Sequence, residues 1–137
     1  MNDDYSDVER RRHKRVPVNF ILRYRIQKPL EVVIRIGNME VNAVMIDLSE
    51  GGMAIITDYD IPSGTELTLK FTLVNTYTQD QSQRNKVVEA LGRVAYIMPM
   101  YKDNRLGISF TEISKHNVST ILEFINLAPK PAPNSNI

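Results

Sequence analysis

Two short segments of this chain hold side chains suited to binding an anion and a purine base. One is the basic cluster ERRRHKR at residues 9–15, and the other is the segment IDLSEGG at residues 46–52. Guanidinium groups bind phosphate oxygens in a bidentate manner, and a carboxylate can accept from two donors on the edge of a guanine at once. Glycine allows the backbone to approach a ligand closely. Together the two segments predict a site for phosphate and purine groups.

The basic cluster by itself is compatible with three interpretations. It can be a solvated arm, a nucleic-acid or membrane contact, or a clamp for a specific anion. The formal net charge of the chain is only +1, so the positive charge is local, which favours a defined anion over a long polyanion. Arg11 and Arg15 are four positions apart, directly before the apolar run that begins at Val16. An arm tethered at this point can fold over the body of the domain.

The second segment has a structural interpretation beside the functional one. It lies between two apolar strand-like runs and therefore has to form a tight connection. In an ordinary turn, Asp47 and Ser49 would bond the local backbone, and Gly51 and Gly52 would adopt positive φ. In a binding site, the same carboxylate and hydroxyl would face a guanine. The residues alone leave both interpretations open.

The elements that must position these segments are mostly β-strands. Alternation is clearest in LTLKFTL at residues 67–73, which places four apolar side chains on one face. After residue 113 the apolar spacing becomes helical, and Ser114 is suited to cap that helix. The pattern predicts an all-β domain, an antiparallel barrel or sandwich with one C-terminal helix. The predicted strands are residues 16–26, 32–36, 41–46, 53–57, 66–73, 87–98 and 106–111.

Length and composition predict one domain with two terminal extensions. The 137 residues suffice for a single core. Residues 1–15 are expected to form a flexible arm, residues 16–128 the barrel and helix, and residues 129–137 a Pro-rich tail. Residues 75–86 are expected to be an exposed loop. The chain has no cysteine, which excludes disulfides and thiolate chemistry, and the lack of a signal core or long apolar run predicts a cytoplasmic protein without membrane insertion.

The two motifs together resemble a known family. Arg11-xxx-Arg15 followed by Asp47-x-Ser49-x-x-Gly52 is similar to the two-part signature of PilZ domains, the bacterial receptors for cyclic di-GMP. The segment ERRRHKRVPV resembles the arm and first strand of that family, and residues 92–94 and 106–110 resemble its late strands. The resemblance covers roughly residues 9–126. It implies an antiparallel, six- to seven-stranded PilZ-like β-barrel with one C-terminal α-helix.

The resemblance also implies a set of ligand contacts. The arginines of the first motif would hold the phosphates and stack on or bond the guanines, and the carboxylate and hydroxyl of the second would bind guanine. The glycine would let the turn approach the ligand, and the arginine before the first motif would stack on a second, intercalated ligand. The implied cyclic di-GMP contacts are Arg10, Arg11, Arg15, Asp47, Ser49 and Gly52.

The remaining candidates do not indicate catalysis. His13 and His116 lack a second ligand or a paired base and are expected to be solvated, which argues against a metal site. Arg93 is expected to form a surface ion pair, in preference to a ligand contact. Without a nucleophile or an acid and base pair, the chain is expected to be a receptor and not an enzyme, with no cofactor besides its ligand.

The implied function is that of a cyclic di-GMP receptor or adaptor. Its arm would become ordered on nucleotide binding, and it would signal to an unidentified effector protein that controls motility, exopolysaccharide, biofilm or virulence. One alternative is a PilZ-like protein-interaction module that does not bind nucleotide. Another is a small basic RNA- or DNA-binding β-barrel that stacks bases on Tyr24, Tyr96 or Tyr101, although no nucleic acid polymer is expected as a partner.

Overall fold

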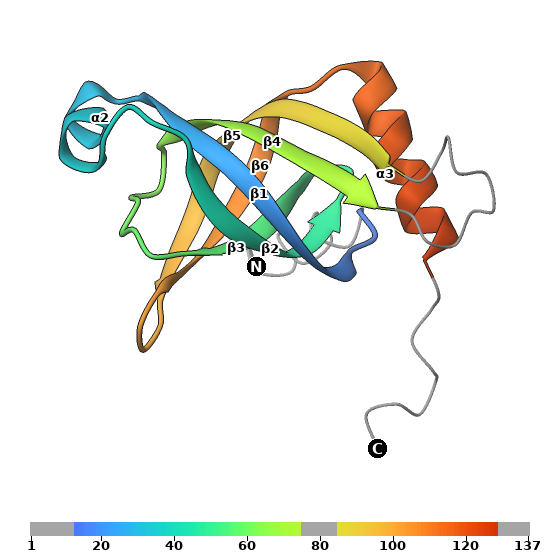
Figure 1. Ribbon diagram of the computed structural model, residues 1–137, viewed down its shortest axis with the longest axis horizontal. Helices are drawn as coiled ribbons and strands as arrows, with labels where there is room; N and C mark the ends of the chain where they lie inside the picture. The colour runs from blue at the N-terminus through green and yellow to red at the C-terminus, as the bar shows by residue number, and fades with distance from the viewer. Residues whose placement is uncertain (1–12, 75–84, 129–137) are drawn as a thin grey trace, which may run out of the picture.

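The computed structural model describes residues 13–74 and 85–128. In this part of the chain, six antiparallel strands close into a barrel in the order β1, β2, β3, β6, β5, β4 (Figure 1). The predicted all-β barrel with a C-terminal helix is therefore confirmed. Most of the arm expected at residues 1–15, namely 1–12, and the Pro-rich tail expected at residues 129–137 lie outside the described residues. Of the exposed loop expected at residues 75–86, residues 75–84 lie outside them as well, and Asn85 and Lys86 belong to a strand. The strands are β1 (Val16–Lys28), β2 (Val41–Ser49), β3 (Gly52–Thr57), β4 (Glu66–Val74), β5 (Asn85–Pro99) and β6 (Asn104–Glu112).

Alternating burial along the strands builds the core inside the barrel. In β4 the predicted alternation is present, since Leu67, Leu69, Phe71 and Leu73 are buried and the residues between them are not. Each such side chain contributes about 1.5–3 kcal/mol when fully buried. A register slip of one residue would turn all four to solvent, so this burial fixes the register of the strand.

The segment after β1 corrects one sequence-based prediction. Residues 32–36 were expected to form a strand, but Leu30–Ile36 form the short helix α2. Gly37 ends the helix with φ +122° and donates its N–H to the carbonyl of Val33. A short apolar run does not distinguish a strand from a helical turn by its periodicity. The barrel therefore has six strands, at the lower end of the predicted range.

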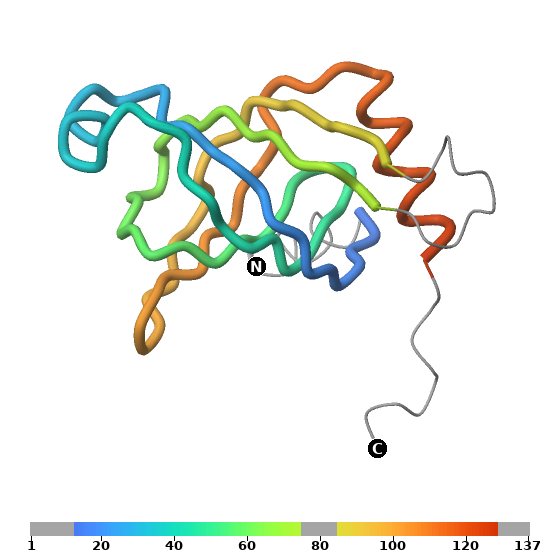
Figure 2. The backbone as a smooth tube through the Cα atoms, in the orientation of Figure 1, coloured from blue at the N-terminus to red at the C-terminus, as the bar shows by residue number. Residues whose placement is uncertain are grey.

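The C-terminal helix α3 (Lys115–Leu127) lies against the barrel on the side opposite α2 (Figure 2). Ser114 caps it as predicted, because its side chain accepts a hydrogen bond from the backbone N–H of Asn117 at 3.1 Å. The apolar face buries Ile121, Phe124 and Ile125, and the Phe124 ring meets the Phe20 ring edge-on at 5.7 Å. Among the described residues, no helix combines the length and the apolar character needed to cross a membrane.

Candidate functional site

The register of three strands brings the two motifs together. Asp47 and Ser49 lie at the end of β2, and Ser49 pairs with Gly52 at the start of β3 across a two-residue turn. Strand β1 pairs with β2 so that Val16 lies opposite Leu48 and Pro17 opposite Asp47. Arg15 directly precedes this paired segment, so the end of the basic cluster lies beside the β2–β3 turn.

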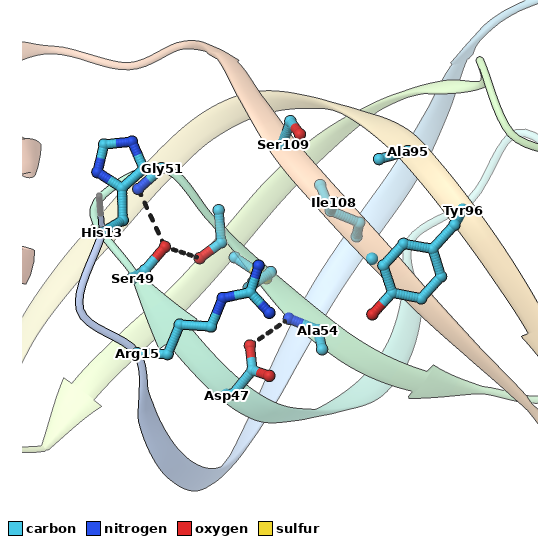
Figure 3. Close-up of a pocket in the computed structure, with 13 residues that line it drawn as sticks. His13, Arg15, Asp47, Ser49, Gly51, Ala54, Ala95, Tyr96, Ile108 and Ser109 are labelled. Atoms are coloured by element: carbon cyan, nitrogen blue, oxygen red, sulfur yellow. Dashed lines mark hydrogen bonds between the residues drawn. The ribbon is translucent and has the colours of Figure 1, made fainter. Parts of the chain in front are cut away.

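Four of the predicted ligand contacts line one pocket of about 220 Å³ (Figure 3). These are Arg15, Asp47, Ser49 and Gly52. The opposite wall comes from β5 and β6 and includes Tyr96 and Ser109. The pocket therefore combines one cation, one carboxylate and hydroxyls with an aromatic ring. The other two predicted contacts, Arg10 and Arg11, lie outside the described residues.

A bulge in β2 directs the Asp47 side chain into the pocket. The pairing of β2 with β3 shifts between Met45 and Asp47. Without this shift, the alternation that buries Ala43 and Met45 would bury Asp47 as well; instead Leu48 is buried and Asp47 is only partly covered. Bulges redirect side chains in this way.

Two contacts hold the Asp47 carboxylate in place. Its Oδ1 accepts a hydrogen bond from the Ala54 backbone N–H at 3.0 Å, and its Oδ2 lies 3.5 Å from Nη2 of Arg105 on β6. A carboxylate offers about four lone-pair sites, so both contacts leave acceptor capacity for a ligand. The side chain is thus oriented before any ligand arrives.

Ser49 supports the turn from within. Its Oγ accepts from the Gly51 N–H at 3.1 Å and donates to the Gly52 carbonyl at 3.4 Å. The backbone-bonding part of the turn interpretation is therefore confirmed, and the same residue lines the pocket. The expectation of positive φ at Gly51 and Gly52 is wrong, because the positive-φ glycines in residues 13–74 and 85–128 are Gly37 and Gly64.

Gly52 is required by the approach of two strands. It pairs with Ser109 of β6, and a Cβ at position 52 would collide with the backbone carbonyl oxygen of Ile108. This steric requirement acts whether or not a ligand is present. The last glycine of the second motif therefore has a structural role in the barrel wall.

Sequence reasoning missed Tyr96 as part of this pocket and considered it only for stacking nucleic-acid bases. A register shift between Val94 and Tyr96 places its ring over Gly107 of β6, where an added Cβ would overlap the ring. Aromatic side chains commonly cover a glycine on a neighbouring strand. The pairing of an aromatic residue with a glycine was the available signal, but it required knowledge of the register.

His13 was expected to be solvated, but its ring contacts Glu50 and Gly51. Its Nδ1 lies 3.2 Å from Oε1 of Glu50, and its ring stands over Gly51 at the rim of the pocket (Figure 3). His116 is exposed on α3. Arg93 forms the predicted surface ion pair, with Nη2 3.8 Å from Oε2 of Glu66, and does not line the pocket.

Comparison with known proteins places this geometry in a family. The model of the PilZ domain matches residues 9–127. No curated protein sequence matches the chain. The inhibitor of motility MotI/DgrA of Bacillus subtilis has a similar fold, with a TM-score of 0.62 and 17% identity over 83% of this chain and 48% of that chain. The present chain thus spans about half the length of that protein.

Two further solved structures share the fold and contain a nucleotide. The PilZ domain of YcgR from Escherichia coli with c-di-GMP, or cyclic di-GMP, matches with a TM-score of 0.58 and 17% identity over 85% of this chain and 89% of that chain. The PlzA protein of Borreliella burgdorferi in complex with c-di-GMP matches with a TM-score of 0.50 and 14% identity over 90% of this chain and 46% of that chain. Because the family model matches residues 9–127, most of the chain, this protein belongs to the PilZ domain family.

Proposed function

We propose that this protein is a receptor for cyclic di-GMP. Members of the PilZ family bind this nucleotide. The observation that carries the proposal is the meeting of Arg15 with Asp47 and Ser49 in one pocket, which joins a cation for phosphate to acceptors for guanine. The proposed contacts are Arg10, Arg11, Arg15, Asp47, Ser49 and Gly52.

The chemistry of each described group supports its proposed role. The Asp47 carboxylate has free lone pairs and can accept from N1 and N2 of guanine together. The Arg15 guanidinium is exposed at the pocket and can bind a phosphate with two parallel hydrogen bonds. The Tyr96 ring offers an apolar wall beside them.

The size of the pocket indicates that the ligand needs a second wall. Its volume of about 220 Å³ is below the roughly 300–1,000 Å³ of typical ligand clefts, whereas cyclic di-GMP has two bases and two phosphates. Because His13 and Arg15 already line the pocket, we propose that the preceding part of the arm of residues 1–15 supplies that wall and becomes ordered when the nucleotide binds. Each charged hydrogen bond contributes about 1.5–3 kcal/mol, and micromolar affinity requires about 8 kcal/mol, so several contacts from the arm are needed.

The proposed output is signalling through another protein. PilZ domains are typically non-catalytic receptors, and we propose the same for this chain. One protein of the same fold is named an inhibitor of motility. We propose an unidentified effector in the cytoplasm that controls motility, exopolysaccharide, biofilm or virulence.

Arg10, directly before the first motif, would stack on a second ligand, so titration should give two nucleotides per protomer.

Isothermal titration calorimetry with alanine variants tests the proposed site. Asp47→Ala and Arg11→Ala should each weaken cyclic di-GMP binding by about 2 kcal/mol, because each removes charged hydrogen bonds to the ligand. Matched controls are Asp58→Ala and Arg25→Ala, which remove exposed side chains outside the pocket. If both site variants bind like the wild type, the site is assigned incorrectly. Binding that is indifferent to the base and falls steeply with salt would instead favour a nucleic-acid-binding barrel.

A further inference from the structure

We propose that His13 and Glu50 form a clasp that holds the arginine-bearing segment on the β2–β3 turn and thereby sets the affinity for nucleotide. The inference rests on the proposed function for the identity of the ligand. The two side chains come from positions 37 residues apart and meet at 3.2 Å. Both are partly covered, with exposed side-chain fractions of 43% for His13 and 34% for Glu50.

The contact adds a second anchor to the segment that carries the cations. Val16, which is buried and paired with Leu48, fixes one end of this segment. His13 fixes the other end, so Lys14 and Arg15 are held between two attached residues. Arg11 lies outside the described residues, but only one residue separates it from His13 in the chain. An anchor at position 13 therefore limits the positions that both motif arginines can reach.

The shape of the turn makes room for the clasp. The His13 ring lies so close to Gly51 that a Cβ there would stand 2.7 Å from the ring atom Cδ2. Gly51 also donates its N–H to Ser49 and its carbonyl accepts from the Phe110 N–H at 2.9 Å, so the residue under the ring is itself fixed to the barrel. The histidine is thus seated on a rigid part of the pocket rim.

The clasp also gives the Glu50 carboxylate a hydrogen-bond partner, and this carboxylate lies beside a site proposed for an anion. Without a partner, the Glu50 carboxylate would repel the phosphates of the ligand. The His13 ring can donate an N–H from Nδ1 in its protonated form and in one neutral tautomer, so the contact does not require a single protonation state. The pair therefore holds the segment in either state, and a protonated ring would in addition offset this repulsion.

Calorimetric titration of cyclic di-GMP into single and double variants tests the clasp. Partly exposed pairs have small coupling energies, so His13→Ala and Glu50→Ala should each weaken binding about twofold to fivefold. The double variant should bind no more weakly than either single variant, because the second change has no contact left to remove. His13→Asn, which retains an N–H donor, and Glu50→Gln, which retains an acceptor oxygen, should restore most of the affinity.

The matched controls are His116→Ala and Glu123→Ala, which remove exposed side chains from α3 and should leave binding unchanged. Effects of the two clasp variants that multiply in the double variant would overturn the proposal, because independent residues behave in that way. Equal loss in the conservative and alanine variants would overturn it as well.

A second measurement does not depend on the nucleotide. In the ligand-free protein, the ¹⁵N relaxation of the Lys14 and Arg15 amides should show more fast motion in Glu50→Ala than in the wild type. Unchanged relaxation would overturn the clasp. A wild-type protein that does not bind cyclic di-GMP would overturn the proposed function, and the relaxation result would then decide by itself whether the clasp exists.

Discussion

Replacing Gly52 with alanine should destabilise the barrel by about 2–4 kcal/mol. The added Cβ would collide with the Ile108 carbonyl oxygen and stand 3.0 Å from the Ile108 carbonyl carbon and 3.1 Å from the Ser109 Cα. All three are backbone atoms of β6 and cannot rotate away, so β3 and β6 would have to separate. Overpacking of this kind costs about 1–3 kcal/mol, and a weakened hydrogen bond between strands adds about 1 kcal/mol.

Gly51→Ala is the matched control for this prediction. Its Cβ would meet the His13 ring, which is a side chain that can move, and Gly51 has no positive φ that alanine would strain. The expected loss of stability is about 0.5 kcal/mol or less, the usual range for surface substitutions. The same change should displace His13 and so weaken nucleotide binding through the clasp.

Urea denaturation followed by circular dichroism separates the two variants. The midpoint of Gly52→Ala should fall clearly below that of the wild type with a similar slope, whereas the midpoint of Gly51→Ala should stay close to it. A Gly52→Ala protein as stable as the wild type would refute the argument that close strand approach requires this glycine. Equal destabilisation by both changes would refute the distinction between backbone and side-chain contacts.

Three other outcomes can be measured. Arg105→Ala should leave the fold intact and weaken cyclic di-GMP binding up to about fivefold in calorimetry, because Asp47 loses one of its two orienting contacts; tighter binding would show that Arg105 competes with the ligand. Arg93→Ala should lower stability by about 0.5 kcal/mol or less and leave the Kd unchanged, because its ion pair with Glu66 is exposed and outside the pocket. Burial raises the pKa of Tyr24 from 10.0 to about 12, so the folded state holds this proton more tightly than the unfolded chain. Stability should therefore be lost as the pH rises from 10 towards 12, and urea denaturation of Tyr24→Phe should show a smaller decline.

The parts of the fold that follow local rules could be predicted from the sequence. The alternation in β4 identifies both the strand and its inward face, and Ser114 marks the start of α3. Helix α2 could not be predicted, because it spans only seven residues, most of them apolar, and only Val32 among them is buried. Such a short run carries no periodicity that separates helix from strand.

The lining of the candidate pocket was predicted where a motif supplied it and missed where it depends on strand register. The meeting of Arg15, Asp47 and Ser49 in one pocket was expected from the two motifs. One bulge turns the Asp47 side chain away from the barrel core and into the pocket, and another places Tyr96 over a glycine. Neither leaves a local pattern in the sequence, because bulges arise from pairing with another strand. The contact of His13 has the same origin, since its partner lies 37 residues away.

The most direct test of the proposed receptor is a calorimetric comparison of cyclic di-GMP with cyclic di-AMP on the wild-type protein. Both nucleotides carry the same two phosphates, but only guanine offers the N1 and N2 donors that the Asp47 carboxylate can accept together. The proposal predicts micromolar binding of cyclic di-GMP, with cyclic di-AMP weaker by about 1–3 kcal/mol. Equal binding of the two nucleotides, or no uptake of cyclic di-GMP, would contradict it.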